Sequence, residues 1–304
     1  MNDLTYSSID ELGPWIKSGR LSSVALVEAA LARIDRLDPV LNSFLVVLKD
    51  SALSEARERD REVRDGRYRG PLHGIPVGLK DLFDVAGVPT TGGSTILRRN
   101  VPSADATVTR KLREAGAVVI GKLNMVEFAM GATLMNPHYG PARNPWDTTR
   151  ITCGSSGGSG AAVAAGLCVA ALGSDTGGSI RMPAAVCGLA GLKPTYGLVS
   201  RRGVLDLSWT CDHVGPMTRT VADCAHVMNA IAGHDAADPG SASRPFADFT
   251  SELGRGLSGV RVEVPRDYFF GKRGRRGGRR GASGNRAPGR KRRIGARGTD
   301  AVNG

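Results

Sequence analysis

The chain has 304 residues, of which 41% are hydrophobic, and a formal net charge of +12 at pH 7. This length allows one large α/β domain, or two small ones, with a buried core. No apolar run approaches the roughly 18 residues that a membrane span needs, and residues 1–11 are polar and acidic, so we expect a cytoplasmic protein. The five cysteines include no C-x-x-C pair, and no histidine lies at metal-ligand spacing, which predicts reduced thiols and no metal site.

The positive charge is concentrated at one end of the chain. Residues 271–304 contain twelve Lys or Arg and one acid, Asp300, whereas residues 1–270 contain 29 basic and 28 acidic residues. Ten of the last 34 residues are Gly and ten are Arg, which leaves almost no side chain to bury. The sequence therefore predicts one domain over residues 1–270 and a basic, Gly/Arg-rich, disordered tail over residues 271–304.

The first 65 residues are predicted to be helical. Ser8 and Glu11 fit a capping box at a helix start. Apolar residues then recur at helical spacing at Val24, Val27, Leu31 and Ile34. From Gly74 the pattern changes to short apolar runs, which predict strands over residues 75–79, 117–120, 168–172 and 260–264. Helical stretches alternate with them over residues 106–115, 160–166 and 221–232, which indicates an α/β fold with a sheet covered by helices.

Two segments rich in glycine and serine, residues 154–160 and 173–181, contain candidate nucleophiles, and Lys80 lies upstream at the end of an apolar run. A serine hydroxyl needs a base within hydrogen-bond reach, and a lysine can serve where burial keeps its amine neutral. Glycines before a serine let consecutive backbone N–H groups point toward one position, as an oxyanion hole requires. Thr176, Gly177 and Gly178 are placed to supply these donors.

In order and spacing, five segments of the chain resemble the amidase signature family. They are residues 74–81 (GIPVGLKD), 90–94 (TTGGS), 154–159 (GSSGGS), 173–181 (GSDTGGSIR) and 187–195 (CGLAGLKPT). The resemblance extends over about residues 5–270. It implies a single α/β domain with a mixed, twisted sheet covered by helices, here without the C-terminal part of the family's fold.

Carried over residue by residue, the resemblance assigns the catalytic groups. The family's nucleophile falls on Ser179, its bridging serine, which follows a cis peptide bond, on Ser155, and its base on Lys80. The family's oxyanion N–H groups fall on Thr176, Gly177, Gly178 and Ser179. The implied reaction is hydrolysis of a small-molecule carboxamide through an acyl-enzyme, with no metal or organic cofactor.

Four positions near these residues bear on the assignment, two as support for the nucleophile's loop and two as departures from the family. Asp175 and Arg181 flank the proposed nucleophile, and we expect them to support its loop through an ion pair or backbone hydrogen bonds. Two positions depart from the family, because Cys153 stands where glycine is usual and Gly160 where alanine is common. Both are small residues, so we expect the loop to survive.

Two rival motifs overlap these segments or lie near them. Residues 116–122 match a phosphate-binding G-x-x-x-x-G-K, but Leu123 replaces the Mg²⁺-binding Ser or Thr and the intervening residues are typical of a strand. Residues 154–158 match a G-x-S-x-G elbow, which would make Ser156 the nucleophile. It would need a downstream acid and a histidine, for which His213, His226 and His234 are available. His226 falls in an apolar helical pattern, which favours an ordinary structural histidine.

Three functional classes follow. The first is a free-standing amidase. Residues 208–217 favour it, because they resemble the corresponding segment of free-standing amidases more than that of the amidotransferase subunits of the same family. The second is an A-type subunit of a tRNA-dependent amidotransferase that uses glutamine. The third is an inactive fragment whose tail binds nucleic acid, a hypothesis weakened by the absence of aromatic residues among the arginines. A homo-oligomer is compatible with all three.

The abrupt change in composition after residue 270 favours a truncation or a shifted reading frame. On this hypothesis the final strands and covering helices of the sheet are missing. We therefore expect the 304-residue chain to be poorly stable and weakly active or inactive.

Overall fold

The computed structural model describes residues 4–262, and its contacts divide the chain into a first unit up to residue 253 and a second unit from residue 254. Residues 254–262 form turns without a helix or strand. The strand predicted over residues 260–264 is therefore wrong for residues 260–262, which are exposed and lack the neighbouring strand that a ladder requires. Residues 263 and 264, and the predicted tail over residues 271–304, lie outside the described residues.

The N-terminal quarter of the chain is mainly helical, as predicted. It contains a 3₁₀ turn η1 (Leu4–Tyr6) and the helices α1 (Ile9–Lys17), α2 (Ser23–Leu41) and α3 (Lys49–Arg64). The capping box is confirmed, because the Ser8 side chain accepts from the Glu11 N–H and the Glu11 carboxylate accepts from the Ser8 N–H. A short strand β1 (Phe44–Val47) interrupts the helices and was not predicted.

The main sheet has six strands in the order β1-β3-β2-β6-β8-β7. Its further members are β2 (Pro76–Lys80), β3 (Val118–Leu123), β6 (Ala170–Ser174), β7 (Ala190–Gly191) and β8 (Val214–Thr218). Strand β2 is parallel to β3 and β6, while β1, β8 and β7 pair antiparallel with their neighbours. The predicted mixed sheet is confirmed, and three of its strands lie within a few residues of the predicted runs.

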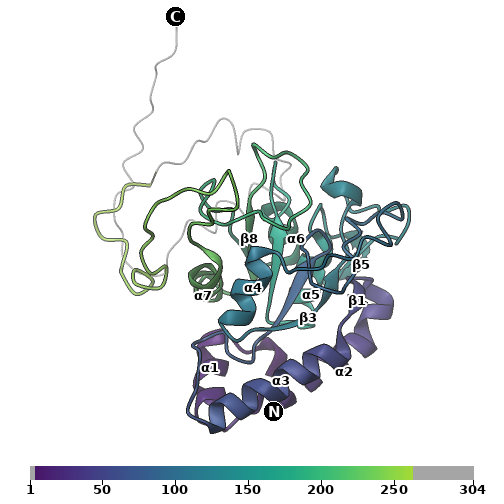
Figure 1. The fold of residues 1–304 in the computed structure, drawn as a ribbon. Helices are drawn as coiled ribbons and strands as arrows, with labels where there is room; N and C mark the ends of the chain where they lie inside the picture. Colours follow the sequence, from purple (N-terminus) through teal and green to yellow (C-terminus); the bar gives the residue numbers. More distant parts are fainter. Residues whose placement is uncertain (1–3, 263–304) are drawn as a thin grey trace, which may run out of the picture. The chain divides into compact units, whose positions relative to one another are not determined.

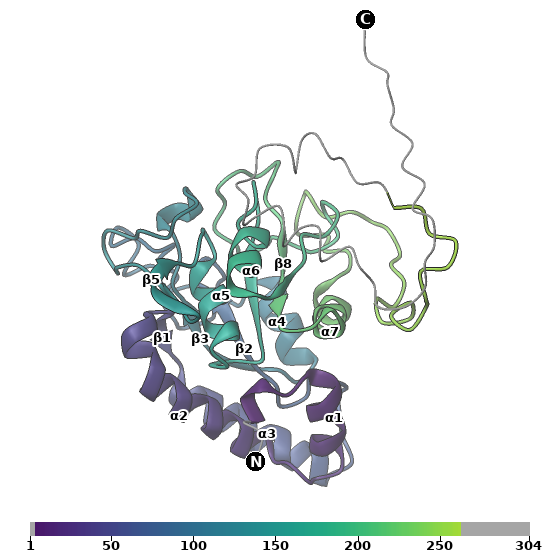
Figure 2. The ribbon, with the colours of Figure 1, turned by 180° about the vertical axis from the view of Figure 1, so that it is seen from behind.

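Helices cover both faces of the sheet. The remaining helices are α4 (Thr107–Glu114), α5 (Gly157–Ala164), α6 (Arg181–Cys187) and α7 (Val221–Ile231), with a 3₁₀ turn η2 (Glu127–Ala129). Alternate residues of a strand point to opposite faces, so Val119 of β3 belongs to one apolar cluster with residues of α1, α4 and α7. Val118 and Ile120 belong to another, with residues of α2, α3 and α5. Figures 1 and 2, seen from opposite sides, show α4 and α5 on opposite sides of the sheet.

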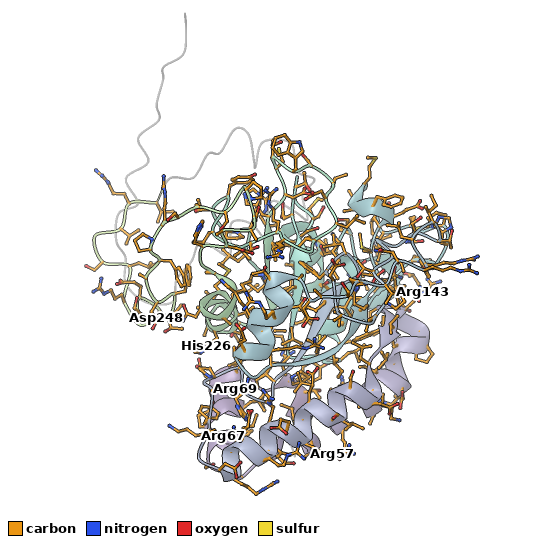
Figure 3. The ribbon with its side chains drawn as sticks, in the orientation of Figure 1. Arg57, Arg67, Arg69, Arg143, His226 and Asp248 are labelled. Carbon is orange, nitrogen blue, oxygen red and sulfur yellow. The ribbon has the colours of Figure 1, made fainter. Side chains whose placement is uncertain are left out.

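Outside this sheet, β4 (Arg143–Asn144) and β5 (Asp147–Ile151) form a small hairpin. Pairs of charged side chains join segments at the surface of the fold. Arg69 pairs with the buried Glu62 of α3, and His226 of α7 lies 2.6 Å from Asp10 of α1 (Figure 3). In residues 4–262 no helix combines the length and the apolar character that crossing a membrane would require.

Candidate active site

The Lys80 side chain is the buried centre of the candidate site. It ends strand β2 and is fully shielded from solvent. Its Nζ lies 2.6 Å from the Oγ of Ser155 and 2.7 Å from the Oγ of Ser174, the last residue of β6. Because β2 and β6 are parallel neighbours, their carboxyl ends meet at one edge of the sheet, and Lys80 and Ser174 meet there.

Burial determines the protonation of this lysine. Removal from water lowers the pKa of Lys80 from 10.5 to about 7, although the carboxylates of Asp212 and Asp175 act in the opposite direction. Neither carboxylate forms an ion pair with the Lys80 amine, and its hydrogen-bond partners among residues 4–262 are two hydroxyl groups. The amine is therefore neutral in a large fraction of molecules at neutral pH, as a general base requires.

The loop that carries Ser155 is held by tight backbone packing. The peptide bond between Gly154 and Ser155 is cis, and the Ser155 carbonyl accepts from the N–H of Val126. Cys153 has φ 55°, a left-handed conformation that glycine adopts more readily, which gives a physical reason for the glycine usual at this position. A Cβ on Gly158 would lie 2.3 Å from the Asn124 carbonyl oxygen, so only glycine permits this approach of α5 to β3.

Ser179 precedes α6 and lies next to the Ser155 loop. Its carbonyl accepts from the Ser156 N–H at 3.2 Å, and 7% of the residue is exposed. Within residues 4–262 its hydroxyl has no hydrogen-bond partner, and Ser155 and Ser179 are not joined through their hydroxyls. The structure therefore brings Lys80 and Ser155 into contact, and it places the main chain of Ser179 against that of Ser156, the residue after Ser155.

The predicted oxyanion donors do not all remain available. The Gly178 N–H donates to the Asp175 carboxylate at 2.7 Å, so this donor is already committed. The N–H groups of Thr176, Gly177 and Ser179 have no acceptor within the described part of the chain. The same carboxylate that orders the loop therefore occupies the Gly178 N–H here, and the oxyanion role expected for this donor stays a prediction.

Asp175 and Arg181 contact each other and the main chain of this loop. The Arg181 guanidinium contacts both Asp175 oxygens, each at 3.0 Å, and the carboxylate also accepts from the N–H groups of Ile180 and Arg181. Burial alone would raise the pKa of Asp175, but these hydrogen bonds outweigh it and hold the pKa well below its usual range. The hydrogen bonds and the ion pair of Asp175 thus fix the backbone that carries Ser179.

Two further residues, which the sequence did not single out, complete the support. Lys193 Nζ donates to the Thr176 carbonyl at 2.7 Å and lies 3.3 Å from Asp175. Asp212 accepts from the Thr176 hydroxyl and, at 2.8 Å and 2.9 Å, from the N–H groups of Leu207 and Ser208. Lys193 lies in the family-like segment 187–195 and Asp212 in the segment 208–217. Their membership of these segments was the only feature of the sequence that could have pointed to them.

Comparison with known proteins identifies the family to which this arrangement belongs. The sequence profile of the family described as Amidase matches residues 25–273, more than half of the chain. The chain belongs to the amidase signature family. Among its relatives, the glutamyl-tRNA(Gln) amidotransferase A subunit of Chloroflexus aggregans is 49% identical over 269 residues, which cover 88% of this chain and 55% of the relative.

Solved structures of amidases share the fold. The peptide amidase of Stenotrophomonas maltophilia is 46% identical, with a TM-score of 0.78 over 81% of this chain and 53% of that one. A bacterial aryl acylamidase of the amidase signature enzymes is 33% identical, with a TM-score of 0.77 over 83% and 52% of the two chains. The present chain therefore spans about half the length of the relatives it matches.

The rival motifs are accounted for within this amidase fold. The G-x-x-x-x-G-K segment forms the buried strand β3, and its Lys122 pairs with Asp81. Ser156 of the elbow motif is fully buried, and its Oγ donates to the Ser174 carbonyl at 3.1 Å. His213 and His226 bond elsewhere, to Cys211 and Asp10. In residues 4–262 no cluster of three or more His, Cys, Asp or Glu side chains could hold a metal ion.

Proposed function

We propose that the chain cleaves a carboxamide C–N bond by nucleophilic catalysis, with Ser179 as nucleophile, Ser155 as proton relay and Lys80 as general base. The observation that carries this proposal is the fully buried Lys80 amine, 2.6 Å from Ser155 and with a pKa of about 7. A neutral amine can donate one N–H to Ser174 and accept the Ser155 proton with its lone pair.

The reaction proceeds in two stages. As the Ser179 oxygen attacks the amide carbon, its proton passes to the Ser155 oxygen, and the Ser155 proton passes to Lys80. The carbonyl oxygen becomes negative and is stabilised by hydrogen bonds from the N–H groups of Thr176, Gly177 and Ser179. Protonated Lys80 then returns its proton through Ser155 to the leaving nitrogen, and ammonia or an amine departs. Water attacks the resulting ester by the same route, which releases the acid and restores Ser179.

Removing one preorganised oxyanion donor lowers the rate of comparable reactions by about 10²- to 10³-fold. The support of this backbone by Asp175, Arg181 and Lys193 is therefore a requirement of the mechanism. A loop free to rotate would have to be ordered again in every turnover.

A second candidate is an A-type amidotransferase subunit, for which the same chemistry releases ammonia from glutamine. The identity of 49% to a glutamyl-tRNA(Gln) amidotransferase A subunit favours it. Hydrolysis of simple amides by the isolated chain supports a free-standing amidase. Glutamine cleavage that occurs only with copurifying partner proteins supports the amidotransferase.

Active-site labelling with a fluorophosphonate, applied to the folded fraction of the 304-residue chain, tests the proposed nucleophile, because labelling needs an intact site and not full turnover. Mass spectrometry should locate the adduct on Ser179, and Ser179→Ala should abolish it. Ser51→Ala removes an exposed hydroxyl on α3 and should label like the unaltered protein. An adduct on Ser156, or a folded protein without an adduct on Ser179, would overturn the proposal.

A further inference from the structure

The sheet contains a second fully buried lysine, Lys122, close to Lys80. Lys122 lies on β3, in register with Leu79 of β2, and is 0% exposed. Its Nζ lies 3.0 Å from Oδ1 of Asp81, the residue that follows Lys80 in the chain. It also donates to the Thr90 hydroxyl at 3.0 Å and to the Pro89 carbonyl at 3.3 Å. An ion pair with Asp81, itself only 1% exposed, is thus built one residue from the proposed base.

The contacts of Lys80 and Asp81 lie on different sides of strand β2. Lys80 meets Ser155 and Ser174, from the α5 and β6 side, whereas Asp81 meets Lys122 of β3 and Thr91. Thr91 occupies the other Asp81 oxygen through both its N–H and its hydroxyl. Every contact of the Asp81 carboxylate in the described chain therefore holds it away from the Lys80 amine.

We propose that Lys122 is a positioning residue for the reaction, because it neutralises the buried carboxylate of Asp81, the residue that follows the proposed base in the chain. The inference rests on the proposed function, since it matters only if Lys80 acts as a neutral base. A buried carboxylate without a partner favours any protonated amine nearby. With Lys122 in place, the pair is neutral overall and Lys80 is left with hydroxyl partners.

The other carboxylates near the two lysines have interactions of their own. On the Lys80 side, Asp175 is held by Arg181 and Lys193, and Asp212 by Thr176 and two main-chain N–H groups. On the Lys122 side, Asp84 is half-buried, and burial raises its pKa, an effect that Lys122 opposes. Asp81 is therefore the carboxylate that would lose its ion pair if Lys122 were replaced.

Substituting the two partners should shift the pKa of Lys80 in opposite directions. Lys122→Met leaves a buried negative charge and should raise the pKa, while Asp81→Asn leaves a buried positive charge and should lower it. An unpaired charge buried on a residue near the base should shift the pKa of Lys80 by about one unit, because charges interact strongly in a protein interior. The double variant, Asp81→Asn with Lys122→Met, is neutral and close in shape, and should return the pKa to its original value.

The experiment is an NMR titration of the 304-residue chain with ¹³C at the lysine Cε, in which Lys80→Met assigns the Lys80 signal. Opposite shifts in the single variants and recovery in the double variant support the inference. A Lys80 midpoint that moves by less than about 0.3 unit in every variant overturns it, since a shift of about one unit is expected. If Lys122→Met does not fold, Asp81→Asn and the double variant decide. Fluorophosphonate labelling of Ser179 in the same samples reports separately on the proposed function.

Discussion

Strands β2 and β3 each bury a lysine completely, and the two amines have different partners. The Lys80 amine forms hydrogen bonds with two serine hydroxyls, whereas the Lys122 amine forms an ion pair with the Asp81 carboxylate. Burial lowers the pKa of both lysines, but for Lys122 the Asp81 carboxylate acts directly against this effect. The comparison teaches that burial alone does not make a lysine a base. The nearest carboxylate matters as well, because Asp81 opposes the loss of a proton from Lys122, whereas Lys80 has no carboxylate among its hydrogen-bond partners in residues 4–262.

The largest expected difference between the lysines is in reactivity. Lys80→Met removes the proposed base and should slow fluorophosphonate labelling of Ser179 by about 10²- to 10⁴-fold. Lys49→Met, an exposed lysine at the start of α3, serves as the matched control and should leave the rate unchanged. Labelling at the original rate in Lys80→Met would remove this lysine from the mechanism.

The second expected difference is in stability. Lys122→Met leaves the Asp81 carboxylate buried without its ionic partner, which should lower the free energy of unfolding by about 3–5 kcal/mol. Lys80→Met leaves no unpaired ion and should not lower this free energy. Urea unfolding of both variants measures the contrast, and equal losses would show that the two lysines play the same structural part.

A smaller effect is expected at the second hydroxyl that Lys80 contacts. Ser174→Ala removes one hydrogen bond to the amine, and the labelling rate should fall about 2- to 10-fold, the equivalent of one ordinary hydrogen bond. Ser174→Thr retains the hydroxyl and should preserve most of the rate. If Ser174→Ala and Ser174→Thr are equally impaired, packing at this position matters and the hydrogen bond does not.

The smallest expected effect concerns the backbone that carries the Lys80 partner. Cys153 adopts φ 55°, so Cys153→Gly should raise the free energy of unfolding by about 0.5–1 kcal/mol. Cys153→Ala retains a Cβ and should give no such gain. A loss of stability in Cys153→Gly would mean that contacts of the thiol outweigh the backbone strain.

The sequence predicted the parts of the fold that depend on local patterns. The strands containing Lys80 and Lys122 and the helix α7 follow from apolar runs and helical spacing, and the Ser8 capping box from two residues. Strand β1 was missed because a four-residue apolar run between two helices resembles a continuation of either. The strand expected at 260–264 is absent from residues 260–262, because an apolar pattern supplies no pairing partner.

Within the site, the sequence predicted the residues that belong to dense motifs and missed those that reach it from afar. The contact between Lys80 and Ser155 was expected. Lys193 and Asp212 were not assigned, since their contacts depend on which segments the fold brings to the end of β6. Lys122 stood out only as part of a rejected phosphate-binding motif. Its ion pair with Asp81 depends on the register of β3 beside β2, which local sequence does not determine.

The pH dependence of Ser179 labelling tests the central claim, that Lys80 acts as the neutral base, most directly. The folded chain holds the pKa of Lys80 near 7, so the neutral, active fraction rises with pH up to that value and then levels off. The account predicts a rate that rises about tenfold per pH unit below pH 7, is constant above pH 8, and loses this limb in Lys80→Met. A rate independent of pH between about 5.5 and 9, or the same limb in Lys80→Met, would contradict it.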